Sequence, residues 1–178
     1  MDGVRELQEQ IDEATGRLLR TVDGFSDDDV RQPSLLPGWT RGHVLTHLAR
    51  GAGALGNLLE WARTGVPIEA YASQQARDEA IEQGAGRSAA ELRVDVTTAA
   101  EKFRAAAVTL PEDAWERQVR ALNYPEFPAF QLLVRRLVEI ELHHVDLGAG
   151  YGPGDWPGRF AGMELDEPMR TQRADRTR

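Results

Sequence analysis

All four histidines of the sequence lie in two apolar stretches that are predicted to be helical. His43 and His47 stand four residues apart in "GWTRGHVLTHLARG", and His143 and His144 are adjacent in "VEIELHHVDL". Imidazole nitrogens bind metals and carry protons, so histidines at helical spacing are the first candidates for a functional site. Their positions around the helix axes decide which of these histidines could belong to the same functional site.

Helical geometry places His47 within the apolar stripe of its helix. Each residue advances about 100° around the axis, so Val44, Leu48 and Leu55 fall within about one quadrant of His47. We therefore predict that His47 faces the core, whereas His43 lies toward the edge of the stripe.

A polar row runs along one face of the second helix, which is otherwise apolar nearly all round. Four side chains follow at steps of three, four and three residues: Arg136, Glu139, His143 and Asp146. Buried charges are costly unless they are paired or bound to a metal. Glu139 and His143 could hold one ion, with His47 from a facing helix as the third ligand. Three protein ligands leave a coordination position open, as in catalytic zinc sites.

The same residues have simpler interpretations. A histidine at the edge of a core usually makes a hydrogen bond and nothing more, and we expect this of His43 and His144. A glutamate four residues before a histidine is common by chance, so Glu139 and His143 could form only an intrahelical contact. The residues alone leave open a metal site and a purely structural bundle with a buried hydrogen-bond network.

The composition is that of a globular protein. The 178 residues suffice for one domain with a sizeable core, and 41% of them are hydrophobic and 28% charged. The net charge of −8 argues against a nucleic-acid partner, because phosphate binding needs clustered Lys and Arg. The absence of cysteine excludes disulfides, zinc–thiolate sites and a thiol nucleophile belonging to the protein.

Neither a membrane segment nor a secretory signal is predicted. No apolar run approaches the roughly 20 residues that a membrane span needs. The N-terminus "MDGVRELQEQ" lacks the basic and apolar regions of a signal peptide. The sequence therefore predicts a cytoplasmic protein without a membrane partner.

Hydrophobic periodicity predicts four long helices and no sheet. They are expected over residues 4–22, from an N-cap at Thr40 to about Thr64, from an N-cap at Ser88 to about Leu110, and from about Ala129 to Leu147, with a short helix over 72–83. We predict an all-α helical bundle over residues 1–165. The polar, basic residues 166–178 are predicted to form a disordered tail.

Three blocks of the sequence resemble the mycothiol-dependent maleylpyruvate isomerase family, within the wider DinB-like helical bundles. The blocks are "LPGWTRGHVLTHLARGAGALGNLLEWARTG", "ARDEAIEQGAGR" and "EIELHHVDLGAGYGPGDWP", in the family's order, and the resemblance covers roughly residues 4–164. It implies a DinB-like four-helix bundle that binds zinc through two histidines and one glutamate.

The resemblance assigns roles to individual residues. The implied zinc ligands are His47, Glu139 and His143, which helical geometry also selects. Asp146 would support the ligands, so that Glu139 and Asp146 are the candidate catalytic residues. Arg77, in the second block, is a candidate for binding substrate carboxylates.

The implied cofactor is mycothiol, a sugar-linked thiol of low molecular weight. A metal with an open position lowers the pKa of a bound thiol and holds the thiolate as a nucleophile. The thiolate would add to the double bond of maleylpyruvate, and rotation and elimination would give the trans isomer, fumarylpyruvate. Arg136, one turn before Glu139, is a second candidate for binding the carboxylates of this small substrate.

Two alternatives to the isomerase follow from the same residues. Family isomerases usually carry a further C-terminal domain after the "DWP" block, where this sequence has "GRFAGMELDEPMRTQRADRTR". A mycothiol S-transferase acting on another electrophile, in detoxification or biosynthesis, is therefore one alternative. A metal-binding bundle without catalysis is the other, and either a monomer or a homodimer is expected.

Overall fold

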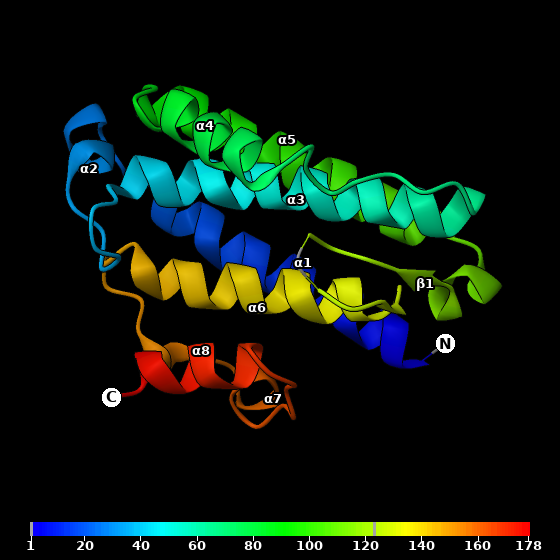
Figure 1. Ribbon diagram of the computed structural model, residues 1–178. Helices are drawn as coiled ribbons and strands as arrows, with labels where there is room; N and C mark the ends of the chain where they lie inside the picture. Colours follow the sequence, from blue (N-terminus) through cyan, green and yellow to red (C-terminus); the bar gives the residue numbers. More distant parts are fainter. Residues whose placement is uncertain (1, 123) are drawn as a thin grey trace.

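The computed structural model describes residues 2–122 and 124–178. Four long helices form a bundle: α1 (Asp2–Asp23), α3 (Arg41–Thr64), α5 (Ala89–Val108) and α6 (Gln131–Asp146) (Figure 1). Shorter helices lie around it: α2 (Asp27–Arg31), α4 (Gln74–Ala85), α7 (Gly158–Ala161) and α8 (Met169–Arg176), with 3₁₀ turns η1 (Glu112–Glu116) and η2 (Pro153–Asp155). The all-α helical bundle predicted from the sequence is confirmed.

Local capping explains where the central helix α3 begins and ends. The Thr40 side chain accepts from the backbone N–H of His43, and the His43 ring accepts from the Thr40 backbone in return. Gly65 ends the helix with φ of +73°, a left-handed conformation that glycine adopts without strain. Both ends lie where the sequence predicts them, because a cap depends on neighbouring residues only.

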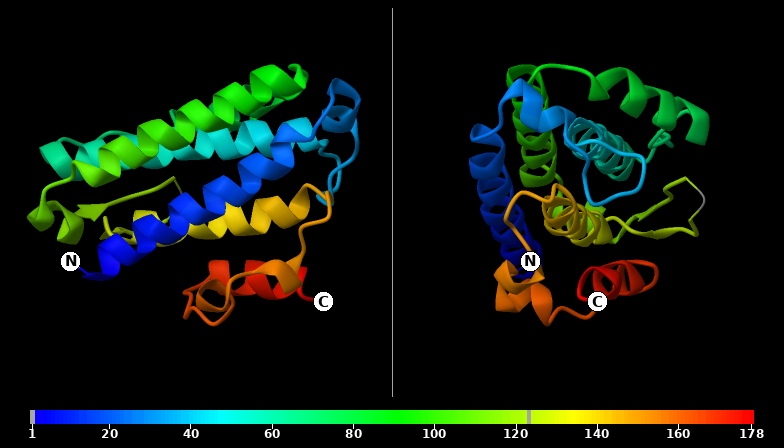
Figure 2. Two further views of the ribbon diagram at one scale, coloured as in Figure 1. Left: turned by 180° about the vertical axis from the view of Figure 1, so that it is seen from behind. Right: turned by 90° about the vertical axis from the view of Figure 1, so that its left-hand side faces the viewer.

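Helix α3 lies at the centre of the bundle and is buried along most of its length. It packs against α5 and α6 on the bundle side and against α4 on its outer side (Figure 2). The contact with α4 is close at Gly42, where an added Cβ would lie 2.2 Å from the Ala85 carbonyl oxygen. This close approach fixes α4, the helix that carries Arg77, against α3.

The C-terminal segment differs from its prediction as a disordered tail. Residues Met169–Arg176 form α8, which lies along α6 (Figure 1). Met169 is buried, and the Arg173 guanidinium donates to the carbonyl oxygens of Phe160 and Met163 at 2.6 and 2.8 Å. The polar composition suggested disorder. Composition alone does not show that Arg173 has hydrogen-bond acceptors on another segment of the fold.

A short hairpin also departs from the prediction of no sheet. Strands β1 (Gln118–Val119) and β2 (Phe127–Pro128) pair antiparallel, with Val119 opposite Phe127. Two residues per strand are too few for an alternating pattern to be recognised. Within the described residues, no helix is long and apolar enough to cross a membrane.

Candidate functional site

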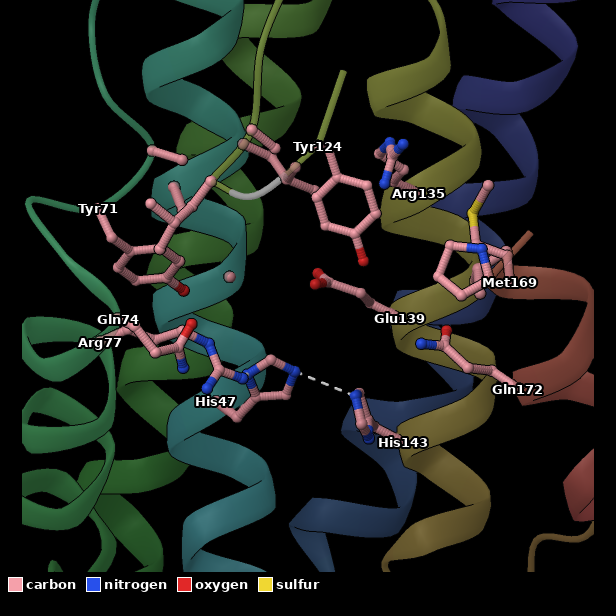
Figure 3. Close-up of a pocket in the computed structure, with 18 of the residues that line it drawn as sticks. His47, Tyr71, Gln74, Arg77, Tyr124, Arg135, Glu139, His143, Met169 and Gln172 are labelled. Atoms are coloured by element: carbon pink, nitrogen blue, oxygen red, sulfur yellow. Dashed lines mark hydrogen bonds between the residues drawn. The ribbon is translucent and has the colours of Figure 1, made fainter. Parts of the chain in front are cut away.

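A cavity of about 750 Å³ lies between α3, α4, α6, α8 and the segment that joins β1 to β2 (Figure 3). Its polar lining comes from four helices and two loops: His47, Tyr71, Gln74, Arg77, Tyr124, Arg135, Glu139, His143 and Gln172. Three residues predicted as metal ligands, one from α3 and two from α6, are therefore brought to one cavity.

His47 and His143 face each other across this cavity. Their Nε2 atoms are 3.0 Å apart, and the rings meet edge to face (Figure 3). On its other side, His143 places Nδ1 2.8 Å from Asp146 Oδ2. A carboxylate only accepts, so His143 carries its proton on Nδ1 and presents a lone pair on Nε2 to the cavity.

The partner of His47 determines its tautomer in the same way. Arg77 Nη2 lies 3.3 Å from His47 Nδ1, and a guanidinium only donates. His47 therefore carries its proton on Nε2 and donates it to His143. Burial is the main cause that lowers the pKa of His47 well below its usual value, and the nearby cations Arg77 and Arg136 add to it. His47 is thus neutral at neutral pH.

Glu139 supplies a carboxylate without a full set of partners. Its Oε2 atom is buried and has no hydrogen-bond partner among the described residues, although Arg136 Nη1 lies 3.7 Å away. Gly51 on α3 leaves the room that Glu139 occupies, because an added Cβ would lie 2.9 Å from Oε2. Buried carboxylate oxygens are normally hydrogen-bonded, so this oxygen is poised for a ligand.

These residues fit a zinc ion in their chemistry. Two imidazole nitrogens and a carboxylate oxygen are donors that zinc prefers, and all three line one cavity. In the part of the chain that is described, no three His, Asp or Glu side chains stand close enough to form a ready-made metal cluster. For His47 and His143 to hold one ion together, the hydrogen bond between their Nε2 atoms would have to open first.

Asp146 is held from two sides at the end of α6. Burial alone would raise its pKa, but hydrogen bonds from His143 and Arg176 outweigh burial and lower it. Asp146 is therefore ionised at neutral pH and does not line the cavity itself. It contacts His143, the residue that the resemblance implies it supports.

The two predicted substrate-binding arginines are placed differently. Arg77 lines the cavity and also pairs with Asp78 at 2.8 Å. Arg136 is only 1% exposed and does not line the cavity; its Nη1 donates to the Leu48 carbonyl oxygen at 2.9 Å. This corrects the prediction for Arg136, whose long side chain turns toward the backbone of α3 instead of toward a substrate.

Arg135, the neighbour of Arg136, lines the cavity and was not predicted. Its guanidinium lies 4.7 and 4.2 Å from the ring centres of Tyr124 and Phe127, and it pairs with no described carboxylate. Tyr71 was also missed, and burial, then the charge of Glu139, raises its pKa to about 12, so that it keeps its proton. No local pattern marks either residue, because both depend on tertiary placement.

The remaining two histidines make hydrogen bonds outside the proposed ligand set, as predicted. His43 caps the start of α3 and lies 3.2 Å from Glu82 through Nε2. His144 Nε2 lies 2.7 Å from Thr21 Oγ1, and its ring stacks on Tyr151. Burial lowers the pKa of His144 to about 4, so it is neutral at neutral pH.

Comparison with known proteins places these features in a family. Residues 11–148 match the mycothiol maleylpyruvate isomerase N-terminal domain. Crystal structures of the mycothiol-dependent maleylpyruvate isomerase and of a histidine-to-alanine mutant each match with a TM-score of 0.85 and 32% identity over 88% of this chain. The chain spans 65% of the length of these structures, and no curated protein matches it. The protein belongs to the mycothiol maleylpyruvate isomerase N-terminal domain family.

Proposed function

We propose that this protein is a zinc-dependent enzyme that uses mycothiol to convert a maleylpyruvate-like substrate from the cis to the trans isomer. The observation that carries the proposal is the meeting of His47 and His143, with Nε2 atoms 3.0 Å apart, in the cavity that Glu139 also lines. The family of residues 11–148 and the named activity of the matching structures support it.

Zinc would be held by His47, Glu139 and His143. When bound, it would lower the pKa of the mycothiol thiol and keep the thiolate in the cavity as a nucleophile. Asp146 keeps the proton of His143 on Nδ1, so that the ring presents its Nε2 lone pair to a ligand. In this proposal Glu139 is a ligand and Asp146 is a supporting group.

Arg77 is set up to change partners when His47 becomes a ligand. A neutral His47 that binds through Nε2 must carry its proton on Nδ1, the atom that now accepts from Arg77. Two donors cannot share that contact, so Nη2 of Arg77 would lose this partner while Nη1 keeps Asp78. A carboxylate of the substrate is the partner that the Nη2 side of the guanidinium would then bind best.

The cavity also supplies a second cation and is large enough for a small molecule. Arg135 lines it, packed on Tyr124 and Phe127 without a described carboxylate partner. Tyr71 keeps a proton that it can donate. A volume of about 750 Å³ lies within the range of small-molecule sites. We assign Arg77 and Arg135 to substrate carboxylates.

Turnover measured with purified components tests this function. Zinc-loaded protein should convert maleylpyruvate to fumarylpyruvate only with mycothiol present, and free thiol should be unchanged at the end because isomerisation regenerates it. Glu139→Gln should lower the rate by more than about 100-fold. The control His43→Gln, which removes a histidine outside the ligand set, should retain the rate.

The alternative, transfer of the thiol to another electrophile, gives a different result. Consumption of mycothiol with an activated aryl halide, without isomerisation of maleylpyruvate, would replace the isomerase by an S-transferase at the same site. Absence of both reactions in zinc-loaded protein would leave a binding bundle without catalysis.

A further inference from the structure

The C-terminal helix α8 reaches the far side of the proposed ligand His143. We propose that Arg176 is a positioning residue that holds Asp146, and through it His143, in the orientation needed to bind a ligand in the cavity. This inference rests on the proposed function for the role of His143. It gives α8, a segment that the sequence predicted to be disordered, a part in the site.

The contact between Arg176 and Asp146 is a two-pronged, charge-assisted pair. Arg176 Nε donates to Oδ1 at 3.0 Å and Nη2 donates to Oδ2 at 2.6 Å. The side chains are 17% and 4% exposed, so water competes little for either group. Both carboxylate oxygens are thereby held in one plane by a rigid guanidinium.

The same Asp146 oxygen connects this pair to His143. Oδ2 accepts from His143 Nδ1 at 2.8 Å as well as from Arg176. A carboxylate held by one partner can rotate, whereas one held by a planar fork keeps Oδ2 directed at Nδ1. Arg176 therefore fixes both the ring orientation of His143 and the nitrogen that carries its proton.

Helix α8 couples this contact to the wall of the cavity. Met169 and Gln172 line the cavity from α8, and the Gln172 carbonyl oxygen accepts from Arg176 Nη1 at 2.8 Å. Arg173 secures α8 to two carbonyl oxygens of the preceding segment. Helix α8 thus forms one side of the cavity and places Arg176 on Asp146.

The competing interpretation is that Arg176 only anchors α8 or only contributes charge. A positive charge near a cation site disfavours the cation, so removing it without other change would tighten zinc binding. Loss of positioning weakens zinc binding instead. The sign of the change therefore separates the two interpretations.

The first test uses metal-free protein and does not depend on zinc. In a proton–nitrogen NMR spectrum, the Nδ1–H of His143 should give a sharp signal because Asp146 protects it from exchange with water. Arg176→Gln should broaden or abolish that signal, and Arg176→Lys should preserve it in part. Arg170→Gln removes an exposed arginine of α8 whose one ion-pair partner among the described residues is Glu167, and it should leave the signal unchanged.

The second test measures zinc affinity by competition with a chromophoric chelator. Arg176→Gln should bind zinc about 10-fold more weakly than the wild type, since loss of a residue that supports a ligand costs about 10–100-fold. Arg176→Lys should fall between the two because it keeps the charge and loses the fork. Arg170→Gln should bind like the wild type.

Three results would overturn the proposal. An unchanged His143 signal in Arg176→Gln would show that Asp146 orients His143 without Arg176. Zinc binding that is unchanged or tighter in that variant would leave only anchoring or charge. Equal zinc affinities and equal His143 signals in Arg176→Gln and Arg170→Gln would likewise leave only anchoring or charge. A wild type that binds no zinc would refute the proposed function, while the NMR comparison would still decide the role of Arg176.

Discussion

At the scale of single residues, a hydrogen-bond relay explains why two apolar helices carry polar side chains. It runs from Arg77 to His47, on to His143, and ends at Asp146, which Arg176 also binds. Each of these contacts pairs a donor with an acceptor, so burial of the relay leaves its groups satisfied. Glu139 stands beside the relay with a buried oxygen that no described group satisfies.

The room around Glu139 predicts the effect of Gly51→Ala. The added methyl group would lie 2.9 Å from Oε2 and would force the carboxylate to shift from its present position. We expect zinc affinity to fall about 10-fold, comparable to the loss of a supporting contact. Chelator competition measures it, with Gly53→Ala as the control, because a Cβ there meets nothing within 4 Å. Equal affinities would show that Glu139 is not a ligand in this position.

The placement of Arg135 predicts a role in substrate affinity. Arg135→Met removes the guanidinium and keeps much of the apolar stem between the aromatic rings. Loss of a hydrogen bond to a charged group costs about 1.5–3 kcal/mol, so KM for the substrate should rise about 10- to 100-fold with kcat nearly unchanged. Steady-state kinetics measure both constants. Arg120→Met at an exposed position is the control, and an unaltered KM for Arg135→Met would remove Arg135 from the site.

At the scale of elements, the bundle could be predicted from the sequence better than the site could. Helix α3 begins after Thr40 and ends before Gly65 because caps and periodicity are local properties. Periodicity also selected His47 and His143, whose directions follow from their positions on the helices. The direction of Arg136 did not follow, because a long side chain chooses among partners that other helices supply.

The packing of α4 on α3 predicts opposite effects for two glycine substitutions. In Gly42→Ala the methyl group would lie 2.2 Å from the Ala85 carbonyl oxygen, so α4 must shift, and we expect destabilisation of about 1–3 kcal/mol. Gly56→Ala lies in open space on the same helix and should stabilise by up to about 1 kcal/mol. Urea unfolding measures the free energy of unfolding of both variants. An unchanged value for Gly42→Ala would mean that α4 does not pack closely on α3.

At the scale of the whole molecule, the cavity depends on segments that are far apart in the sequence. Its lining extends from Leu36 to Gln172 and includes α8, whose polar sequence resembles a disordered tail. Local composition cannot show that Arg173 and Arg176 find acceptors on other segments. Only the assembled fold reveals that α8 belongs to the cavity.

The proposed ligands lie on two different helices, so zinc should stabilise the entire fold. His47 comes from α3, whereas Glu139 and His143 come from α6, so unfolding must separate them. Zinc at 100 times its dissociation constant should raise the free energy of unfolding by about 2.7 kcal/mol. Urea unfolding with and without zinc measures the gain, which should vanish in His47→Ala. A similar gain in that variant would locate the zinc elsewhere.

The metal content of the purified protein tests the central claim most directly. Protein prepared without chelators or a metal-binding tag would be subjected to elemental analysis beside His47→Ala, Glu139→Ala and the control His43→Gln. We predict about one zinc per chain in the wild type and in His43→Gln, and loss of zinc in the two ligand variants. A folded wild type that contains no zinc and takes none up, or zinc retained in both ligand variants, would contradict the proposed site.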